Sequence, residues 1–390
     1  MNFPVGFYDF HKDTAFNFQL NARLYNFGGV DYETVAAVGR EVYDFKSWAA
    51  VVGKAANRFH NEGNFIASAA CSTAAIFFMP DDDPNESNAD KSFKKTMYEQ
   101  CMKDYEHVCK ENGATYVRIP FEDYYLPALY KCHDSGGKGD VVMHGGYDSF
   151  MQEFIPLMMY IYENGYNVYM FEGFGQGEVL NKCGKKMKPE WEICTKPVLD
   201  YFKLDDVTLI GASLGGYLAA RAAAYEPRIK RVVLWDLIYD FYGSILRKMP
   251  EEMRELIEKL MKEPENPMWK AIEEQMHQNQ FSLWLFKQGR HIYGNITTLY
   301  DYFKSIQPYN TRTISPLIKQ DVLVMAGEDD LYTVYFQEQM NALSNAATVS
   351  GRIFTREENA SHHCQIGNLK LAFDYILAWV DSKQGTGDKL

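Results

Sequence analysis

The sequence lacks the features that mark several classes of protein. Its seven cysteines are scattered, odd in number and without paired C-x-x-C spacing, which argues against a disulfide framework or a zinc site. An excess of basic residues is also missing, because the net charge is −12. Such an acidic surface repels phosphate backbones and anionic membranes. We therefore expect no metal, no nucleic acid and no membrane partner.

Long apolar runs are missing as well. The longest nearly apolar stretch, residues 65–79, contains serine and threonine and is too short to span a bilayer, so we interpret it as a buried helix. Residues 1–6 show no basic region followed by an apolar stretch, as a signal peptide would. These features predict a cytoplasmic protein. No internal repeat or low-complexity tract is visible in the sequence.

What is present is ordinary globular composition, with 390 residues, 46% of them hydrophobic and 24% charged. Apolar residues recur at spacings of three and four in the first part of the chain, which predicts helices over residues 32–43, 47–62 and 92–112. Asp44 and Ser47 are candidate N-caps, and residues 81–90 are typical of a solvated loop. We expect residues 1–114 to form a helical N-terminal cap domain.

From Thr115 onward strands and helices alternate, which predicts an α/β fold with a mostly parallel, doubly wound sheet. The expected strands cover residues 115–120, 125–131, 140–144, 167–171, 207–210, 231–235, 321–325 and 352–354. Amphipathic helices rich in Met and aromatic residues interrupt this pattern. We therefore divide the core into residues 115–236 and 313–390, separated by a helical lid insertion over residues 237–312.

The strongest chemical signal is Gly211-Ala-Ser213-Leu-Gly215, a G-x-S-x-G between a predicted strand and a predicted helix. A serine on such a turn has a strained backbone and an exposed Oγ. Glycines two positions away on either side avoid a clash with the neighbouring strand or helix. Ser213 is therefore the candidate nucleophile, and a serine alcohol needs a base to accept its proton.

In this arrangement the acid and then the histidine follow the serine along the chain. His362 and His363 lie between the last predicted strand and the last helix, where the base belongs, whereas His277 and His291 lie in the insertion. Position alone does not choose between His362 and His363. The acid should end the penultimate strand, where Asp330 has the usual offset from Gly327, with Asp329 and Glu328 as alternatives.

An oxyanion needs two backbone N–H donors. One should come from Leu214, and the other from Tyr147 or Gly146 in the loop that follows the strand over residues 140–144. The glycine-rich loop over residues 171–177 could be mistaken for a phosphate loop. It lacks an acidic partner or a Gly-Lys-Ser/Thr sequence, so we interpret it as structural.

These motifs together resemble a branch of the α/β-hydrolases. The motifs are His144-Gly-Gly-Tyr-Asp-Ser149, Phe171-Glu-Gly-Phe-Gly-Gln-Gly-Glu178, Gly211-Ala-Ser-Leu-Gly215, Gly327-Glu-Asp-Asp330 and His363-Cys-Gln-Ile-Gly-Asn368. The branch includes fermentation-respiration-switch (FrsA-like) esterases, 2,6-dihydroxypseudooxynicotine hydrolase and fungal hydrolases of polyketide pathways. Phe174 departs from the proline that is more usual there.

The resemblance implies an α/β-hydrolase fold, a Ser213–Asp330–His363 triad and a homodimer. In that branch the motif histidine directly precedes Cys-Gln, which favours His363. An acidic residue near Asp236 contacts substrate in some members, so Asp236 is a possible substrate contact, although a helix cap is as good an interpretation.

We expect a serine hydrolase that cleaves a carboxylic ester of a small apolar or aromatic substrate, without metal or organic cofactor. The alternatives are a hydrolase of C–C bonds in a β-diketone or an acylated aromatic or polyketide-type compound, and a non-catalytic ligand-binding protein of this fold.

Overall fold

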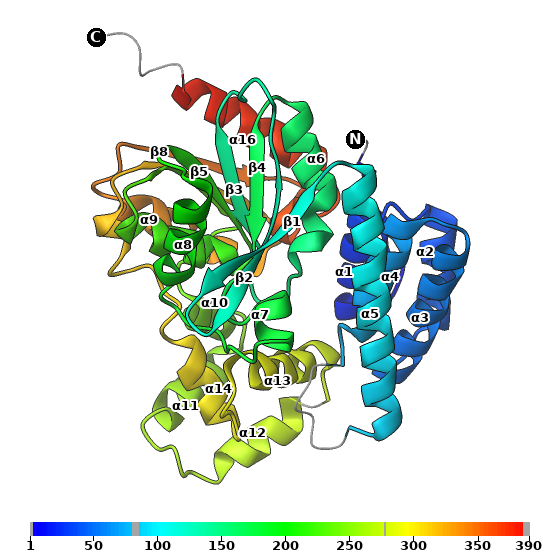
Figure 1. The fold of residues 1–390 in the computed structure, drawn as a ribbon. Coiled ribbons are helices and arrows are strands. Elements are labelled where there is room, and N and C mark those ends of the chain that lie inside the picture. The colour runs from blue at the N-terminus through cyan, green and yellow to red at the C-terminus, as the bar shows by residue number, and fades with distance from the viewer. Residues whose placement is uncertain (1–2, 80–85, 277, 385–390) are drawn as a thin grey trace.

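A computed structural model describes residues 3–79, 86–276 and 278–384, so His277 and part of the predicted loop over 81–90 lie outside the described residues. An eight-stranded sheet forms the centre, in the order β1-β2-β4-β3-β5-β6-β7-β8 (Figure 1). β1 and β2 pair antiparallel, β2 pairs antiparallel with β4, and the other pairs are parallel. The predicted mostly parallel sheet is confirmed. The strands are β1 Thr115–Phe121, β2 Tyr124–Lys131, β3 Asp140–His144, β4 Asn167–Phe171, β5 Val207–Ala212, β6 Ile229–Trp235, β7 Asp321–Gly327 and β8 Thr348–Phe354.

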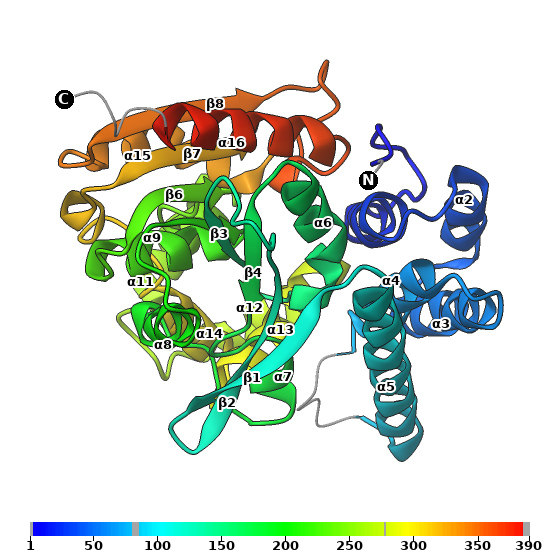
Figure 2. The same ribbon diagram turned by 45° about the horizontal axis from the view of Figure 1, so that its top comes forward.

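Helices cover both faces of the sheet. Successive side chains of a strand point to opposite faces, so the apolar residues of each strand need helices on both sides to bury them. Val141 and Met143 of β3 pack on one side, in the same apolar cluster as α6 (Ile155–Glu163) and α16 (Leu369–Gln384). Val142 packs on the other side, with the helices α8 (Glu192–Phe202) and α9 (Gly215–Tyr225). α15 (Phe336–Ala342) contacts β7 and packs against this second cluster (Figure 2). The sheet is therefore doubly wound, as predicted.

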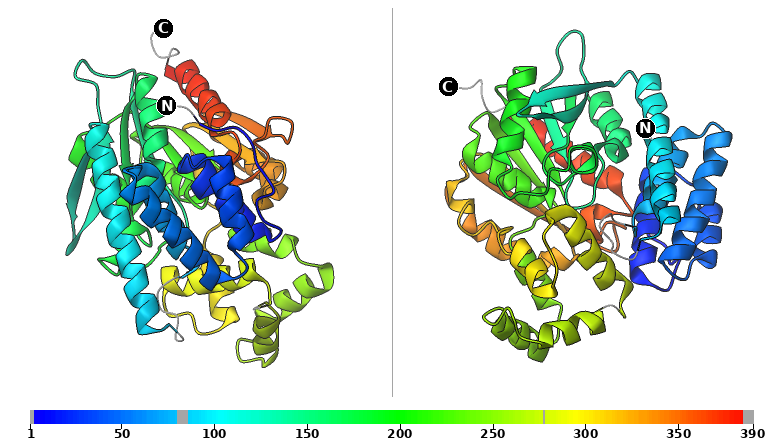
Figure 3. Two further views of the ribbon diagram at one scale, coloured as in Figure 1. Left: turned by 90° about the vertical axis from the view of Figure 1, so that its right-hand side faces the viewer. Right: turned by 60° about the horizontal axis from the view of Figure 1, so that its bottom comes forward.

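The N-terminal helices, residues 14–111, lie beside the sheet (Figure 3). Asp44 caps α3 by accepting the N–H of Ser47 at 2.7 Å, and Ser47 completes this capping box from the third helical position. The predicted helices are confirmed here, but α1 and the π-helix η1 that continues it were not predicted. The elements are α1 Thr14–Gln19, η1 Leu20–Phe27, α2 Tyr32–Glu41, α3 Phe45–Asn61, α4 Phe65–Ile76 and α5 Asn88–Glu111.

The insertion helices follow β6 and precede β7. They approach the N-terminal helices, because the Trp284 indole N–H donates to the Phe77 carbonyl at 3.1 Å and the two rings stack. The insertion helices are α10 Phe241–Arg247, α11 Glu251–Leu260, α12 Met268–Met276, α13 Gln280–Tyr293 and α14 Leu299–Ile306. The short elements that complete the fold are η2 Met151–Phe154, α7 Gly177–Asn181, η3 Ser315–Leu317, η4 Leu331–Tyr335 and η5 His363–Gln365. Among the residues described, no helix combines the length and apolar character needed to cross a membrane.

Candidate active site

Ser213 stands on the sharp turn between β5 and α9. Its φ of 61° lies in the left-handed region, which an L-residue adopts at a cost that the surrounding structure must offset. The two flanking glycines permit the turn. A Cβ at Gly211 would lie 1.9 Å from the Gly215 carbonyl oxygen, and one at Gly215 would lie 2.7 Å from the Gly145 carbonyl oxygen. The motif therefore forms the strand–turn–helix that its sequence predicts.

The structure brings together three side chains from separate strand ends. His363 Nε2 lies 2.7 Å from Ser213 Oγ, and His363 Nδ1 lies 2.7 Å from Asp330 Oδ2. An ionised carboxylate only accepts hydrogen bonds, so the proton of a neutral His363 resides on Nδ1 and Nε2 is left to accept the serine proton. This is the arrangement in which a histidine acts as a general base toward a serine.

Burial and charge act in opposite directions on this pair. Burial lowers the pKa of His363, but the charge and hydrogen bond of Asp330 together with the contacts of Cys364 outweigh burial and raise the pKa well above its usual value. Burial raises the pKa of Asp330, but the charge and hydrogen bond of His363, together with hydrogen bonds from Asp236 and the Tyr332 N–H, outweigh burial and lower the pKa. His362 instead stacks on the Phe7 ring, with centroids 3.5 Å apart. Only His363 of the two candidate bases therefore meets Ser213 and Asp330.

Within the described ranges, neither the Leu214 N–H nor the Tyr147 N–H has an acceptor, as an oxyanion donor requires. The N–H of Gly146 is engaged, because it donates to Ser149 Oγ at 3.2 Å. A Cβ at Gly146 would lie 2.6 Å from the Leu214 nitrogen, so glycine allows the two loops to approach. This geometry favours Tyr147 over Gly146 as the second donor.

Ser213 opens into a cavity of about 270 Å³ between the sheet, the N-terminal helices and the insertion helices. Most of its wall is aromatic and aliphatic, as is usual in small-molecule sites. The aromatic wall residues are Phe18, Phe27, Tyr147, Phe154, Trp235, Phe241, Phe281, Trp284 and Tyr332. The charged side chains on the wall, besides Asp330 and His363, are Arg23, Asp148 and Glu153.

Comparison with known proteins identifies the family to which the chain belongs. The family model described as the alpha/beta hydrolase fold matches residues 141–368, which is more than half of the sequence and contains Ser213, Asp330 and His363. The chain belongs to the α/β-hydrolase fold family. The resemblance that the motifs suggested is thereby confirmed at the level of the family.

Relatives of this α/β-hydrolase cover most of its length. The protein named hydrolase LUC6 from a Fusarium species is 29% identical over 303 residues, 69% of each chain. Hydrolase acrC from Aspergillus aculeatus is 27% identical over 311 residues, 69% of this chain and 71% of the relative. Among solved structures, 2,6-dihydroxy-pseudo-oxynicotine hydrolase has a TM-score of 0.65 at 19% identity, with 92% of this chain and 93% of that chain covered. That likeness shows the fold.

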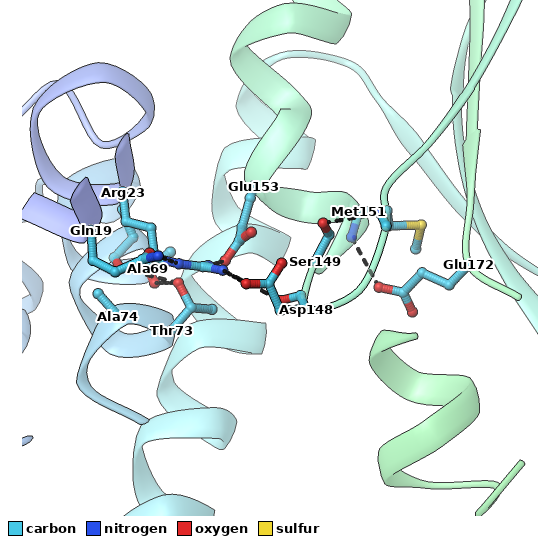
Figure 4. Close-up of polar contacts among 12 residues, drawn as sticks. Gln19, Arg23, Ala69, Thr73, Ala74, Asp148, Ser149, Met151, Glu153 and Glu172 are labelled. Carbon is cyan, nitrogen blue, oxygen red and sulfur yellow. Dashed lines mark hydrogen bonds and ion pairs between the residues drawn. The ribbon is translucent and has the colours of Figure 1, made fainter. Parts of the chain in front are cut away.

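A buried ionic cluster that the sequence analysis missed joins the N-terminal helices to the loop after β3 (Figure 4). The guanidinium of Arg23, on η1, forms a short ion pair with Glu153 and donates to the Asp148 carbonyl oxygen at 3.3 Å. Its Nε donates to Gln19 Oε1 at 2.9 Å, and the group lies over the Phe77 ring. Burial raises the pKa of Glu153 and of Asp148, against the opposing effect of Arg23.

The expectation that Asp236 contacts substrate is wrong. Its side chain is fully buried and is absent from the cavity wall, because it lies behind His363 rather than in front of Ser213. A helix-cap role does not apply either, since Asp240 caps α10. The ligand atoms of Asp236, His363 and Cys364 lie within 4.8 Å of one another, but both His363 nitrogens are already engaged in the contacts with Ser213 and Asp330.

The glycine-rich loop over residues 171–177 supports the loop after β3, in agreement with its interpretation as structural. Gln176 Nε2 donates to the Gly145 and Gly146 carbonyl oxygens at 2.8 and 3.0 Å. The Glu172 carboxyl accepts the N–H groups of Met151 at 2.9 Å (Figure 4) and Glu178 at 2.8 Å. Burial raises the pKa of Glu172 to about 7.

Proposed function

We propose that this α/β-hydrolase is a serine hydrolase that cleaves a carboxylic ester through an acyl-enzyme. The observation that carries the proposal is the unbroken contact of Ser213, His363 and Asp330 at 2.7 Å each, opening into a cavity. The relatives named hydrolase agree with this class of reaction.

In the first half of the reaction, His363 Nε2 accepts the Ser213 proton while Oγ bonds to the substrate carbonyl carbon. The negative charge formed on the carbonyl oxygen is stabilised by the N–H groups of Leu214 and Tyr147. Collapse breaks the bond to the alcohol oxygen, which takes the proton from His363. In the second half, water gives its proton to His363 and attacks the acyl group, and Ser213 regains its proton as the acid leaves. Asp330 stabilises the imidazolium in both halves.

The cavity supports a small substrate of apolar or aromatic character. Its volume of about 270 Å³ is at the lower end for ligand sites, and aromatic side chains from three parts of the chain form the wall. We propose that residues 1–114, which contain the N-terminal helices, act as a cap domain and that residues 237–312 act as a lid. The core is then formed by residues 115–236 and 313–390. Substrate contacts then come from Phe18 of the cap, Trp284 of the lid and Tyr147 of the core.

A second candidate reaction is hydrolysis of a C–C bond next to a ketone. It is favoured by Arg23, because a guanidinium on the cavity wall can stabilise the oxygen of an enolate or phenolate leaving group. Since Asp236 lies outside the cavity, His363 would supply the proton to the leaving carbon. Turnover of aryl esters without turnover of any β-diketone or acylated phenol would count against this reaction.

The role of Ser213 is tested with a fluorophosphonate probe and mass spectrometry of the adduct. We expect an adduct on Ser213 in the native protein and in His362→Ala, a loss of most of the reaction rate in His363→Ala, and no adduct in Ser213→Ala. The His362 variant is the matched control, since its ring stacks on Phe7 and does not contact Ser213. A native protein that stays unlabelled, yet melts cooperatively, would reject the nucleophile assignment.

Assembly and location remain predictions. A homodimer is expected from the resemblance, and light scattering of the purified protein tests it. A cytoplasmic location, expected from composition, is tested by fractionation of the source cells.

A further inference from the structure

Two carboxyl groups from neighbouring strand ends face the same nitrogen of His363. Asp330 follows β7 and accepts from Nδ1 at 2.7 Å, while Asp236 follows β6 and has Oδ2 at 3.6 Å from that nitrogen. The reaction described above needs one acid at Nδ1. The second carboxyl has no part in it and is fully buried, so its presence requires another explanation.

Asp236 is tied to the segment that carries His363. Its Oδ2 accepts the Cys364 N–H at 2.8 Å and its Oδ1 accepts a Gln365 side-chain N–H at 2.8 Å. Cys364 and Gln365 both have left-handed backbone, with φ of 52° and 50°. Such a conformation is unfavourable for a residue other than glycine and persists only when the surroundings hold it. Asp236 supplies two of the contacts that hold it.

Charge decides the protonation of the pair. Two adjacent buried carboxyls cannot both be ionised without strong repulsion, so one keeps a proton. His363 stabilises the charge on Asp330, whereas burial and that Asp330 charge raise the pKa of Asp236 well above its usual value. The proton of a neutral Asp236 has an acceptor beside it, because the Asp236 and Asp330 carboxyl groups share a side-chain hydrogen bond.

We propose that Asp236 is a positioning residue of this site, a neutral carboxylic acid that holds the His363 segment and replaces Asp330 at Nδ1 when Asp330 is removed. The proposal rests on the proposed function, because it assigns a role relative to the catalytic histidine. In an Asp330→Ala protein the repelling charge is gone, so Asp236 ionises and accepts the Nδ1 proton after a shift of less than 1 Å, from 3.6 Å toward 2.7 Å.

The test is a double-mutant cycle of Asp330→Ala and Asp236→Asn, read as the rate of fluorophosphonate labelling of Ser213 and as kcat for an aryl ester. Asparagine is neutral and isosteric with a protonated aspartate, so we expect Asp236→Asn alone to lower either rate less than fivefold. Loss of the acid in a triad typically lowers kcat about 10⁴-fold. We expect Asp330→Ala to lose only about 10²-fold, and the double variant to lose at least another tenfold beyond the product of the single effects.

Asp240→Asn is the matched control, since Asp240 lies four residues further on, caps α10 and pairs with Arg312 away from His363. It should leave both rates unchanged in either background. Melting temperatures of all variants identify any that are unfolded. For such a variant, Asp236→Ser, which keeps an acceptor for the Cys364 N–H, replaces asparagine in the cycle.

The outcomes separate the two proposals. If the native protein is not labelled at Ser213, the proposed function fails before the cycle is measured. If it is labelled but the two substitutions act independently, or if Asp236→Asn alone is as harmful as Asp330→Ala, then Asp236 is not a neutral reserve acid and only the present inference is overturned.

Discussion

Removal of the Arg23 guanidinium should destabilise the protein strongly at neutral pH. Arg23→Met keeps the aliphatic bulk but leaves the Glu153 carboxylate, about one-tenth exposed, without its ion-pair partner. Breaking a buried ion pair from one side costs about 3–5 kcal/mol, because the remaining charge is buried and uncompensated. We expect a loss of about that size in the free energy of unfolding, measured by urea denaturation at pH 7.5.

A second substitution, at Glu153, tests whether the loss of stability comes from the uncompensated charge. In Arg23→Met/Glu153→Met the charges of this pair are both absent, and the Asp148 carboxyl, 20% exposed, is what remains of the cluster. Apolar replacement of a whole buried pair is often nearly neutral. The double variant should therefore be more stable than Arg23→Met alone, even though it carries an additional substitution. The control is Lys131→Met, which removes a cation that contacts the Asn112 carbonyl between β2 and α5, away from this cluster. It should cost less than about 1 kcal/mol, in the range of an ordinary hydrogen bond.

The pH dependence gives an independent readout. Burial raises the pKa of Glu153 above 4.5, and the Arg23 charge opposes that rise, so Arg23→Met raises the pKa further. A carboxyl with a raised folded pKa contributes stability that is present below its unfolded pKa and lost as the pH rises through the folded value. The deficit of Arg23→Met should thus be smaller at pH 5 than at pH 8. An equal deficit at both values, or additive effects of the two methionine substitutions, would refute the assignment of Arg23–Glu153 as a coupled buried pair.

Three further outcomes follow from the geometry. Gly146→Ala places a Cβ 2.6 Å from the Leu214 nitrogen, so the two oxyanion donors must move apart. The kcat for an aryl ester should then fall on the order of 10²–10³-fold with the melting temperature little changed. An unchanged kcat would contradict the donor assignment. Burial raises the pKa of Glu172 to about 7, so its protonated form contributes stability that is present at pH 4.5 and lost as the pH rises through 7. Glu172→Gln should therefore gain stability relative to the native protein between pH 5 and 8, by about 3 kcal/mol at most. Parallel curves of unfolding free energy against pH would reject this prediction. Because the base must be neutral and the pKa of His363 is raised, kcat/KM should fall as the pH drops through a value above 6.5, and an acid limb below 6.5 would show that Asp330 does not act on His363 as described.

Sequence reasoning succeeded where the signal is local. The largely apolar residues 207–210 predicted a buried strand, which the structure extends to Ala212, and G-x-S-x-G predicted the turn at Ser213. The order of strand ends located the acid at Asp330 and its neighbours and the base at His362 or His363, and the resemblance then favoured His363. In each case a few consecutive residues determine both the element and the position of the side chain.

Sequence reasoning failed where a residue's contact partner is distant in the sequence. Arg23 resembles any basic residue on a helix until Glu153, 130 positions later, packs against it. Asp236 was assigned to substrate from the resemblance alone, because an acidic residue near this point contacts substrate in some members. Its partners Cys364 and Gln365, 128 and 129 positions away, hold it behind the histidine instead. The π-helix η1 also has no local signature, since its widened turn is set by what packs against it.

The contact of the N-terminal helices with the cavity has a consequence for biosynthesis. Phe18, Arg23 and Phe27 leave the ribosome before any strand of the sheet exists, and the Gly6 N–H reaches its acceptor, the Gly367 carbonyl oxygen at 2.7 Å, only after residue 367 has been made. An apolar surface that stays uncovered during synthesis is prone to aggregate, so we expect the nascent chain to pass through an aggregation-prone stage. The same order of synthesis means that the proposed triad cannot assemble before the last strand and His363 have been made.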